Sequence, residues 1–343
     1  MKKYLLVLCC LLGVATAQAQ NDDAAMVADS ISSDSTDVLA FFCNRDTMEY
    51  RFMATKREIN GSDTVFRSAY AQDFMLCITD STDEGYRMEY VATDFDHEDT
   101  IKVDPQALMH QRVFERIKGR KLVFRLSDVG ELMEFVNWRD VRDDVIQGIF
   151  MAYNELYPMV PGLEELVPKG QVMGIVSQTY QTEEGLLAWF KEVGLLFNAH
   201  GKRFGQRSEL NDEGSDTEFP SSSIVVSGYE KTGDDGDKDA EFDEDYYVMA
   251  ETETHLKGED IASFYRSKGA ALGEGNMLSK TIVDQHSEDI ADKELLVTDG
   301  YYIHYFFNGW PKAMESRNEE VIGNRKTVET RYVDWLSRSW YNE

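Results

Sequence analysis

The most acidic run of the sequence carries the side chains that come closest to a metal-binding pattern. Asp235, Asp237 and Asp239 recur at every second position, which is the spacing of oxygen ligands in a calcium-binding loop. Such a loop turns on glycine at its sixth position and ends on a bidentate glutamate at its twelfth. This sequence has Ala240 and Tyr246 at those two positions. The pattern therefore predicts a solvated acidic hairpin tip, with weak calcium binding as the minor alternative.

Other chemically reactive residue types show no specific pattern. The six histidines lack the spacing of metal ligands, and neither a serine nucleophile elbow nor a phosphate-binding glycine loop is present. Cys43 and Cys77 have no signature of a catalytic thiol, and in an oxidising compartment they either pair as a disulfide or remain two thiols. Carboxylates are so numerous that a glycosidase-like pair cannot be singled out. We predict no catalytic residue, no cofactor and no metal site.

One aromatic segment near the C-terminus is the strongest candidate for ligand contact. Tyr301, Tyr305, Phe307 and Trp310 lie in or beside a predicted strand that is aromatic on both faces. A strand of this kind must have its second face covered by protein, or must use that face to bind something. We predict these four residues as ligand-binding residues. The alternative is that most of them belong to the core.

Alternating hydrophobicity predicts the strands that would position these residues. Between Asp46 and Ile59, apolar residues at 48, 50, 52 and 54 share one face, and Asn60-Gly61 follows as a hairpin signal. The same reasoning predicts strands at 64–70, 74–79, 86–95, 121–126, 131–138, 171–180, 223–231, 245–255, 277–286, 301–307, 312–322 and 327–340. Residues 208–223 read as a surface loop.

Helical periodicity predicts about four packing helices. Asp104 and Pro105 begin the first, which Gly119 closes, because Asp is a good N-cap and Pro a good first helical residue. The others are expected at 139–156, from Thr182 to Phe197, and at 259–266.

The predicted fold class is α+β, with bent antiparallel sheets and packing helices. Residues 41–170 form one meander-plus-helix unit and residues 171–343 a second β-rich unit. The similar order of elements in the two halves is explained equally well by duplication of one unit or by coincidence between generic hairpins.

The N-terminus predicts export. Residues 1–19 combine Lys2 and Lys3 with a short apolar run and the small-x-small pattern Ala17-Gln18-Ala19, which is typical of a cleaved signal peptide. Residues 20–40 are expected to be a disordered leader. Losing the signal changes the formal net charge from −28 to −30. A charge of this sign argues against nucleic acid and against anionic lipid headgroups as partners. We expect a periplasmic, surface or extracellular location and no transmembrane segment after cleavage.

Short motifs carry a resemblance to known proteins. His200-Gly201-Lys202 and Phe307-Asn308-Gly309-Trp310-Pro311-Lys312, with the closing strands, resemble a group of uncharacterised exported β-rich proteins of Gram-negative bacteria. The order of elements is also similar to the periplasmic lipoprotein carriers. That resemblance implies an open, strongly bent sheet with a greasy inside under helices. This chain is longer than a simple carrier of that kind.

The sequence favours an exported, non-enzymatic binding protein of the cell envelope, whose partner is an apolar small molecule or an envelope protein. A secreted hydrolase that uses carboxylates is one alternative, and a structural or adhesive surface scaffold is another. Export, aromatic-rich meanders and the lack of catalytic signatures support the first hypothesis.

Overall fold

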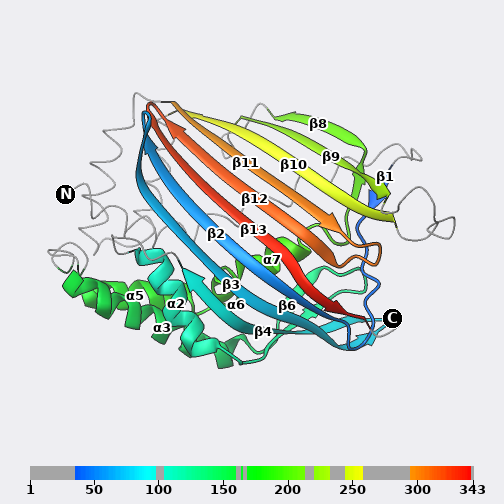
Figure 1. Ribbon diagram of the computed structural model, residues 1–343, viewed down its shortest axis with the longest axis horizontal. Helices are drawn as coiled ribbons and strands as arrows, with labels where there is room; N and C mark the ends of the chain where they lie inside the picture. Colours follow the sequence, from blue (N-terminus) through cyan, green and yellow to red (C-terminus); the bar gives the residue numbers. More distant parts are fainter. Residues whose placement is uncertain are drawn as a thin grey trace.

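The computed structural model describes residues 35–97, 104–159, 164, 168–212, 220–231, 244–257 and 294–340. Within these ranges one large antiparallel sheet dominates, and its long strands curve around helices that lie on one side of it (Figure 1). The antiparallel sheet that the sequence predicts is confirmed. The predicted signal peptide, the predicted helix at 259–266 and the predicted strand at 277–286 lie outside the described residues.

Eleven strands form the sheet, in the order β6-β5-β4-β3-β2-β13-β12-β11-β10-β9-β8. Their bounds are β2 Thr47–Asn60, β3 Asp63–Thr82, β4 Gly85–His97, β5 Leu122–Leu126, β6 Leu132–Phe135, β8 Arg207–Asp212, β9 Ser221–Lys231, β10 Glu244–Lys257, β11 Glu294–Tyr305, β12 Pro311–Ile322 and β13 Arg325–Ser339. A separate two-stranded sheet pairs β1 Ser35–Asp37 with β7 Arg203–Gly205.

Side-chain alternation along the strands sets which face is buried. In β2 the predicted apolar positions Met48, Tyr50, Phe52 and Ala54 are all buried, whereas the residues between them are partly or fully exposed. Successive side chains of a strand point to opposite faces, so this pattern aims the apolar half of β2 at the helices. The concave face of the sheet therefore holds the main core.

Two glycines permit tight connections between neighbouring strands. Gly61 has a φ of 63° in the hairpin between β2 and β3, as the Asn-Gly signal predicts. Gly309 has a φ of 86° between β11 and β12, and a Cβ there would lie 2.2 Å from the carbonyl oxygen of Leu39. The second connection thus accepts only glycine, for both conformational and steric reasons.

Five helices are described, rather than the predicted four or so. They are α2 Pro105–Ile117, α3 Trp138–Met159, α5 Lys169–Thr179, α6 Glu183–Leu187 and α7 Lys191–Phe197. The predicted cap of α2 is confirmed, since the carboxylate of Asp104 accepts hydrogen bonds from the backbone N–H groups of Gln106 and Ala107, both at 3.1 Å. Within the described ranges, every helix is too short or too polar to span a bilayer.

Replacing Asp104 by alanine is expected to lower the free energy of unfolding by about 1 kcal/mol, because two N–H groups at the start of α2 lose their acceptor. Urea denaturation measures the loss. Asp104→Asn is the matched control and should stay close to the wild type, since asparagine also caps well. Equal stability of the two variants would contradict the capping role.

Three predicted elements were wrong in type or extent. Residues 171–180 belong to helix α5 and not to a strand, because Val172 and Val176 are buried one helical turn apart. The predicted surface loop at 208–223 is partly strand, since β8 pairs along β9. The helix predicted from Thr182 to Phe197 is broken at residues 188–190 into α6 and α7. At the break, Trp189 stacks on His110 of α2 and Phe190 contacts Tyr90 of β4.

The folded chain begins before the predicted start at Phe41. Residues 35–37 pair with β7, and Val38 and Ala40 are buried in the core. The predicted boundary at residue 170 falls inside α5, and both predicted units contribute strands to the same sheet, joined where β2 pairs with β13. The duplication of a meander-plus-helix unit stays a prediction.

Candidate functional site

The four aromatic residues predicted to bind a ligand are not gathered into one surface. Tyr305 and Trp310 are both 0% exposed, and Tyr301 packs partly buried against the core. Tyr305 stacks on Tyr246 with ring centroids 5.1 Å apart. Phe307, in contrast, is 42% exposed. The structure thus places these side chains in different environments.

The other predicted site residues also give no site in the described part of the chain. Asp235, Asp237 and Asp239 lie outside the described residues, and the described residues contain no group of acidic, histidine or cysteine side chains able to hold a metal ion. No disulfide joins Cys43 to Cys77. The strand register explains this, because Cys77 of β3 lies opposite Thr47.

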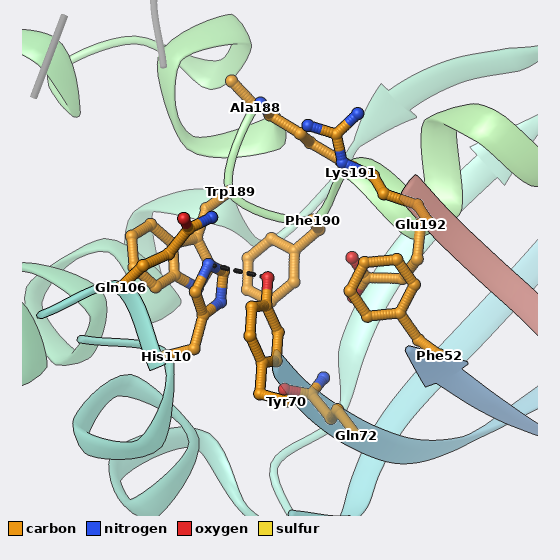
Figure 2. A pocket seen from close by; sticks show the side chains of 11 residues that line it. Phe52, Tyr70, Gln72, Gln106, His110, Ala188, Trp189, Phe190, Lys191 and Glu192 are labelled. Atoms are coloured by element: carbon orange, nitrogen blue, oxygen red, sulfur yellow. Dashed lines mark hydrogen bonds between the residues drawn. The ribbon is translucent and has the colours of Figure 1, made fainter. Parts of the chain in front are cut away.

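A pocket that the sequence did not predict lies between the concave face of the sheet and the helices (Figure 2). Its volume is about 70 Å³, and its lining comes from β2, β3, β13, α2 and residues 188–192. One water molecule needs roughly 10–15 Å³ of such a volume. The pocket therefore accommodates a few waters or the polar end group of a ligand whose other atoms lie outside it. The break between α6 and α7 forms its outer wall.

Stacked rings make one side of the pocket rigid. His110 of α2 lies between Tyr70 of β3 and Trp189, with ring centroids 4.3 Å and 4.6 Å away. A hydrogen bond of 2.9 Å joins the Tyr70 hydroxyl to Nε2 of His110 (Figure 2). Burial lowers the pKa of His110 to about 3, with further contributions from Lys191 and Arg331. The imidazole is therefore neutral at physiological pH.

A buried carboxyl group ends a short hydrogen-bond chain beside the pocket. The side-chain amide of Gln72 donates to the Tyr90 hydroxyl at 2.5 Å, and that hydroxyl donates to Oε1 of Glu192 at 2.9 Å. Glu192 is only 4% exposed. Burial raises the pKa of Glu192 to about 7, because a charged carboxylate loses its hydration there. This carboxyl group can carry a proton near neutral pH.

Three cationic side chains lie near one another beside the pocket, those of Lys56, Lys191 and Arg331. Lys56 Nζ lies 2.8 Å from one oxygen of Glu329, and Arg331 Nη2 lies 3.0 Å from the other. The Nζ atom of Lys191 at the start of α7 has no hydrogen bond or ion pair to any described residue. Partial burial, with the positive charge of Arg331 as the next largest cause, lowers the pKa of Lys191 to about 8. At neutral pH this lysine is mostly protonated without a counterion from the described chain.

Sequence reasoning missed every residue that lines this pocket. One signal was present: the segment from Leu186 to Phe197 is apolar on most faces, yet it contains the adjacent charges Lys191 and Glu192. Charged residues in a segment expected to be buried mark a functional site or a satisfied ion pair. The two charges do not pair with each other here, since the carboxyl group of Glu192 bonds to Tyr90.

Comparisons with known proteins do not assign this chain to a family. No known protein family and no curated protein matches the chain. Among solved structures, lipovitellin, described for its lipid–protein interactions, aligns over 87% of this chain and 26% of its own, at 12% identity and a TM-score of 0.34. The chain thus spans about a quarter of that protein's length.

Two outer membrane proteins align with lower scores. A loop-deletion mutant of OmpT from Vibrio cholerae aligns over 84% of this chain and 99% of its own, at 8% identity and a TM-score of 0.20. An outer membrane channel from Pseudomonas putida F1 aligns over 87% and 98%, at 6% identity and a TM-score of 0.14. Similarities this weak support no conclusion about fold or function. They do not confirm the resemblance to exported Gram-negative proteins or to lipoprotein carriers.

Proposed function

We propose that this protein is an exported, non-enzymatic binding protein of the bacterial cell envelope, and that it holds a small polar ligand in the pocket between the sheet and the helices. The observation that carries the proposal is an open space lined by the buried Glu192, which is 4% exposed, and by the half-buried Lys191. Burying an ionisable group costs several kcal/mol unless it is well paired. Apolar residues at both positions would serve the fold better, so the charges are explained by a ligand.

The aromatic wall supports a binding role. Tyr70, His110 and Trp189 are held in one stack before any ligand arrives. A site whose side chains are already ordered loses less conformational entropy on binding, which improves affinity. Gln106 of α2 adds an amide to the pocket lining, and amides fix the orientation of polar ligands.

This geometry favours a polar ligand in the pocket over an apolar ligand on the aromatic strand. Tyr305 and Trp310, two of the four predicted contact residues, are covered by the protein's own side chains. The hydrolase alternative has one candidate carboxyl group here, Glu192, whereas glycoside hydrolysis typically uses a pair of carboxylates. A polar ligand bound without chemistry fits the lining better.

A pocket-filling substitution tests the proposal. Ala188 lines the pocket at the end of α6, and a phenylalanine there would occupy the space that a ligand needs. Wild-type protein is screened by thermal shift against small carboxylates, phosphates, sugars, amines and amino acids at millimolar concentration. At least one of these classes should raise the Tm of the wild type, and Ala188→Phe should abolish that rise.

The matched control is Ala71→Phe, which adds the same ring to strand β3 on the opposite face of the sheet from Tyr70 and Gln72. This variant should respond to the ligand as the wild type does. If none of the classes shifts the wild-type Tm, or if both variants keep the shift, this pocket is not a binding site.

A further inference from the structure

We infer that the pocket binds the anionic group of its ligand, a carboxylate or a phosphate, and that Lys191 is the residue that binds it. This inference rests on the proposed binding function and adds the charge of the ligand to it. The reasons are that no described residue pairs with the ammonium group of Lys191, that the charges around it are mostly positive, and that aromatic side chains line the pocket.

The counterion argument starts from the pairing of the neighbouring cations. Lys56 and Arg331 share the carboxylate of Glu329, one oxygen each. Lys191 lies in the same cluster, but no described carboxylate reaches its Nζ atom. Lys191 is half-buried, so its ammonium group has lost part of its hydration, and an anion in the adjacent pocket would compensate for that loss.

The surrounding charges favour the same ligand class. The ionised groups that act on Lys191 are two cations, Arg331 and Lys56, and one anion, Glu329. The pocket is therefore locally positive in a chain whose formal net charge is −28. Below neutral pH the carboxyl group of Glu192 is mostly protonated, so it adds little negative charge to the pocket. In this form it can also donate a hydrogen bond.

The walls limit the shape of the ligand. Trp189 and Phe52 both line the pocket that Lys191 also lines, so two of its walls are aromatic. A flat apolar body with an anionic end matches this combination of surfaces, and so does a free small anion. The probes described below distinguish a ligand with an apolar body from a free small anion.

Isothermal titration with matched probes tests the inference. Benzoate, benzamide and benzamidine have the same ring and carry a negative, a neutral and a positive head group, and inorganic phosphate is the probe without a ring. We expect benzoate or phosphate to bind, and benzamide and benzamidine to bind at least about tenfold more weakly. Binding of benzoate alone identifies a carboxylate ligand with an apolar body, and binding of phosphate alone identifies a small free anion.

Substitutions at Lys191 separate charge from folding. Lys191→Met should reduce the affinity for the anionic probe by about tenfold or more, because the contact between the two opposite charges is lost. Lys191→Arg keeps the charge and should retain most of the affinity. Lys121→Met is the matched control, since Lys121 is an exposed lysine that pairs with Glu89 away from the pocket.

The pH dependence of benzoate binding gives a second readout. Wild-type affinity should fall as pH rises from 6 to 9, because Glu192 ionises near pH 7 and Lys191 loses its proton near pH 8. The charged and titratable groups around this position are Glu192, His110, Tyr70, Tyr90, Lys56, Glu329 and Arg331. In Lys191→Arg the fall above pH 8 should disappear, since arginine stays protonated.

Different results would contradict the inference about the anion and the proposed binding function. If benzamide or benzamidine binds as well as benzoate, or Lys191→Met keeps full affinity, the anion assignment is wrong and the binding site stands. If no compound in the wider thermal-shift panel binds either, the proposed function itself is wrong.

Discussion

Replacing Trp310 by alanine is expected to lower the free energy of unfolding by about 3–5 kcal/mol, the range for deleting a large buried aromatic side chain. Trp310 is 0% exposed and lies 4.3 Å from the ring of Phe42, measured between centroids. Its indole N–H donates to Oδ2 of Asp46 at 3.4 Å. The substitution would leave a cavity between the sheet and the segment before β2, and would remove this hydrogen bond.

Urea denaturation of Trp310→Ala measures the effect, with Phe307→Ala as the control. Phe307 is close in sequence but 42% exposed, so its removal should cost less than about 1 kcal/mol. This pair also tests the sequence-based prediction that both residues bind a ligand. A loss of stability at Trp310 places it in the core, whereas similar small losses for both variants would contradict that assignment.

Replacing Glu192 by glutamine is expected to stabilise the protein at alkaline pH and to have little effect at acid pH. The pKa of Glu192 is raised by burial from the ordinary value of 4.5 to about 7, so the native state binds its proton more tightly than the unfolded state does. The stability that this proton contributes is fully present below pH 4.5 and is lost as pH rises to 7. Glutamine resembles the protonated form and keeps an acceptor oxygen for Tyr90.

The expected size of this effect follows from the shift in pKa. A rise of this extent corresponds to about 3 kcal/mol above pH 7. Chemical denaturation at pH 5, 6, 7 and 8 should show the difference between Glu192→Gln and the wild type growing with pH. Glu184→Gln on α6 is the control, because Glu184 is exposed and should show no such trend. A difference that stays constant with pH would show that Glu192 is ionised throughout this range.

Local patterns predicted most of the strands correctly because their cause is local. The alternation of Met48, Tyr50, Phe52 and Ala54 reflects the two-residue repeat of a strand, and the Asn60-Gly61 turn reflects the positive φ that glycine accepts. The Asp104 cap depends on groups within three residues of it. These features depend on short stretches of chain.

The errors arose where distant contacts overrode local preference. Residues 171–180 contain enough β-branched side chains to resemble a strand, but they lie against α3 and not in the sheet, and they adopt a helix there. The segment from Thr182 to Phe197 has the periodicity of one helix. It breaks at 188–190, where Trp189 stacks on His110 of α2 and Phe190 contacts Tyr90 of β4.

The sequence by itself determined an acidic chain and an antiparallel meander with identifiable buried faces, because composition, two-residue alternation and turn residues are properties of neighbouring positions. The tertiary structure alone decided the candidate site. Glu192 is one of 63 acidic residues, and nothing beside it in sequence shows that Tyr90 will donate to it or that water will be excluded. Burial, pairing and pKa depend on which side chains meet in space. Here those side chains come from strands and helices separated by up to about two hundred and eighty residues, from Phe52 to Arg331.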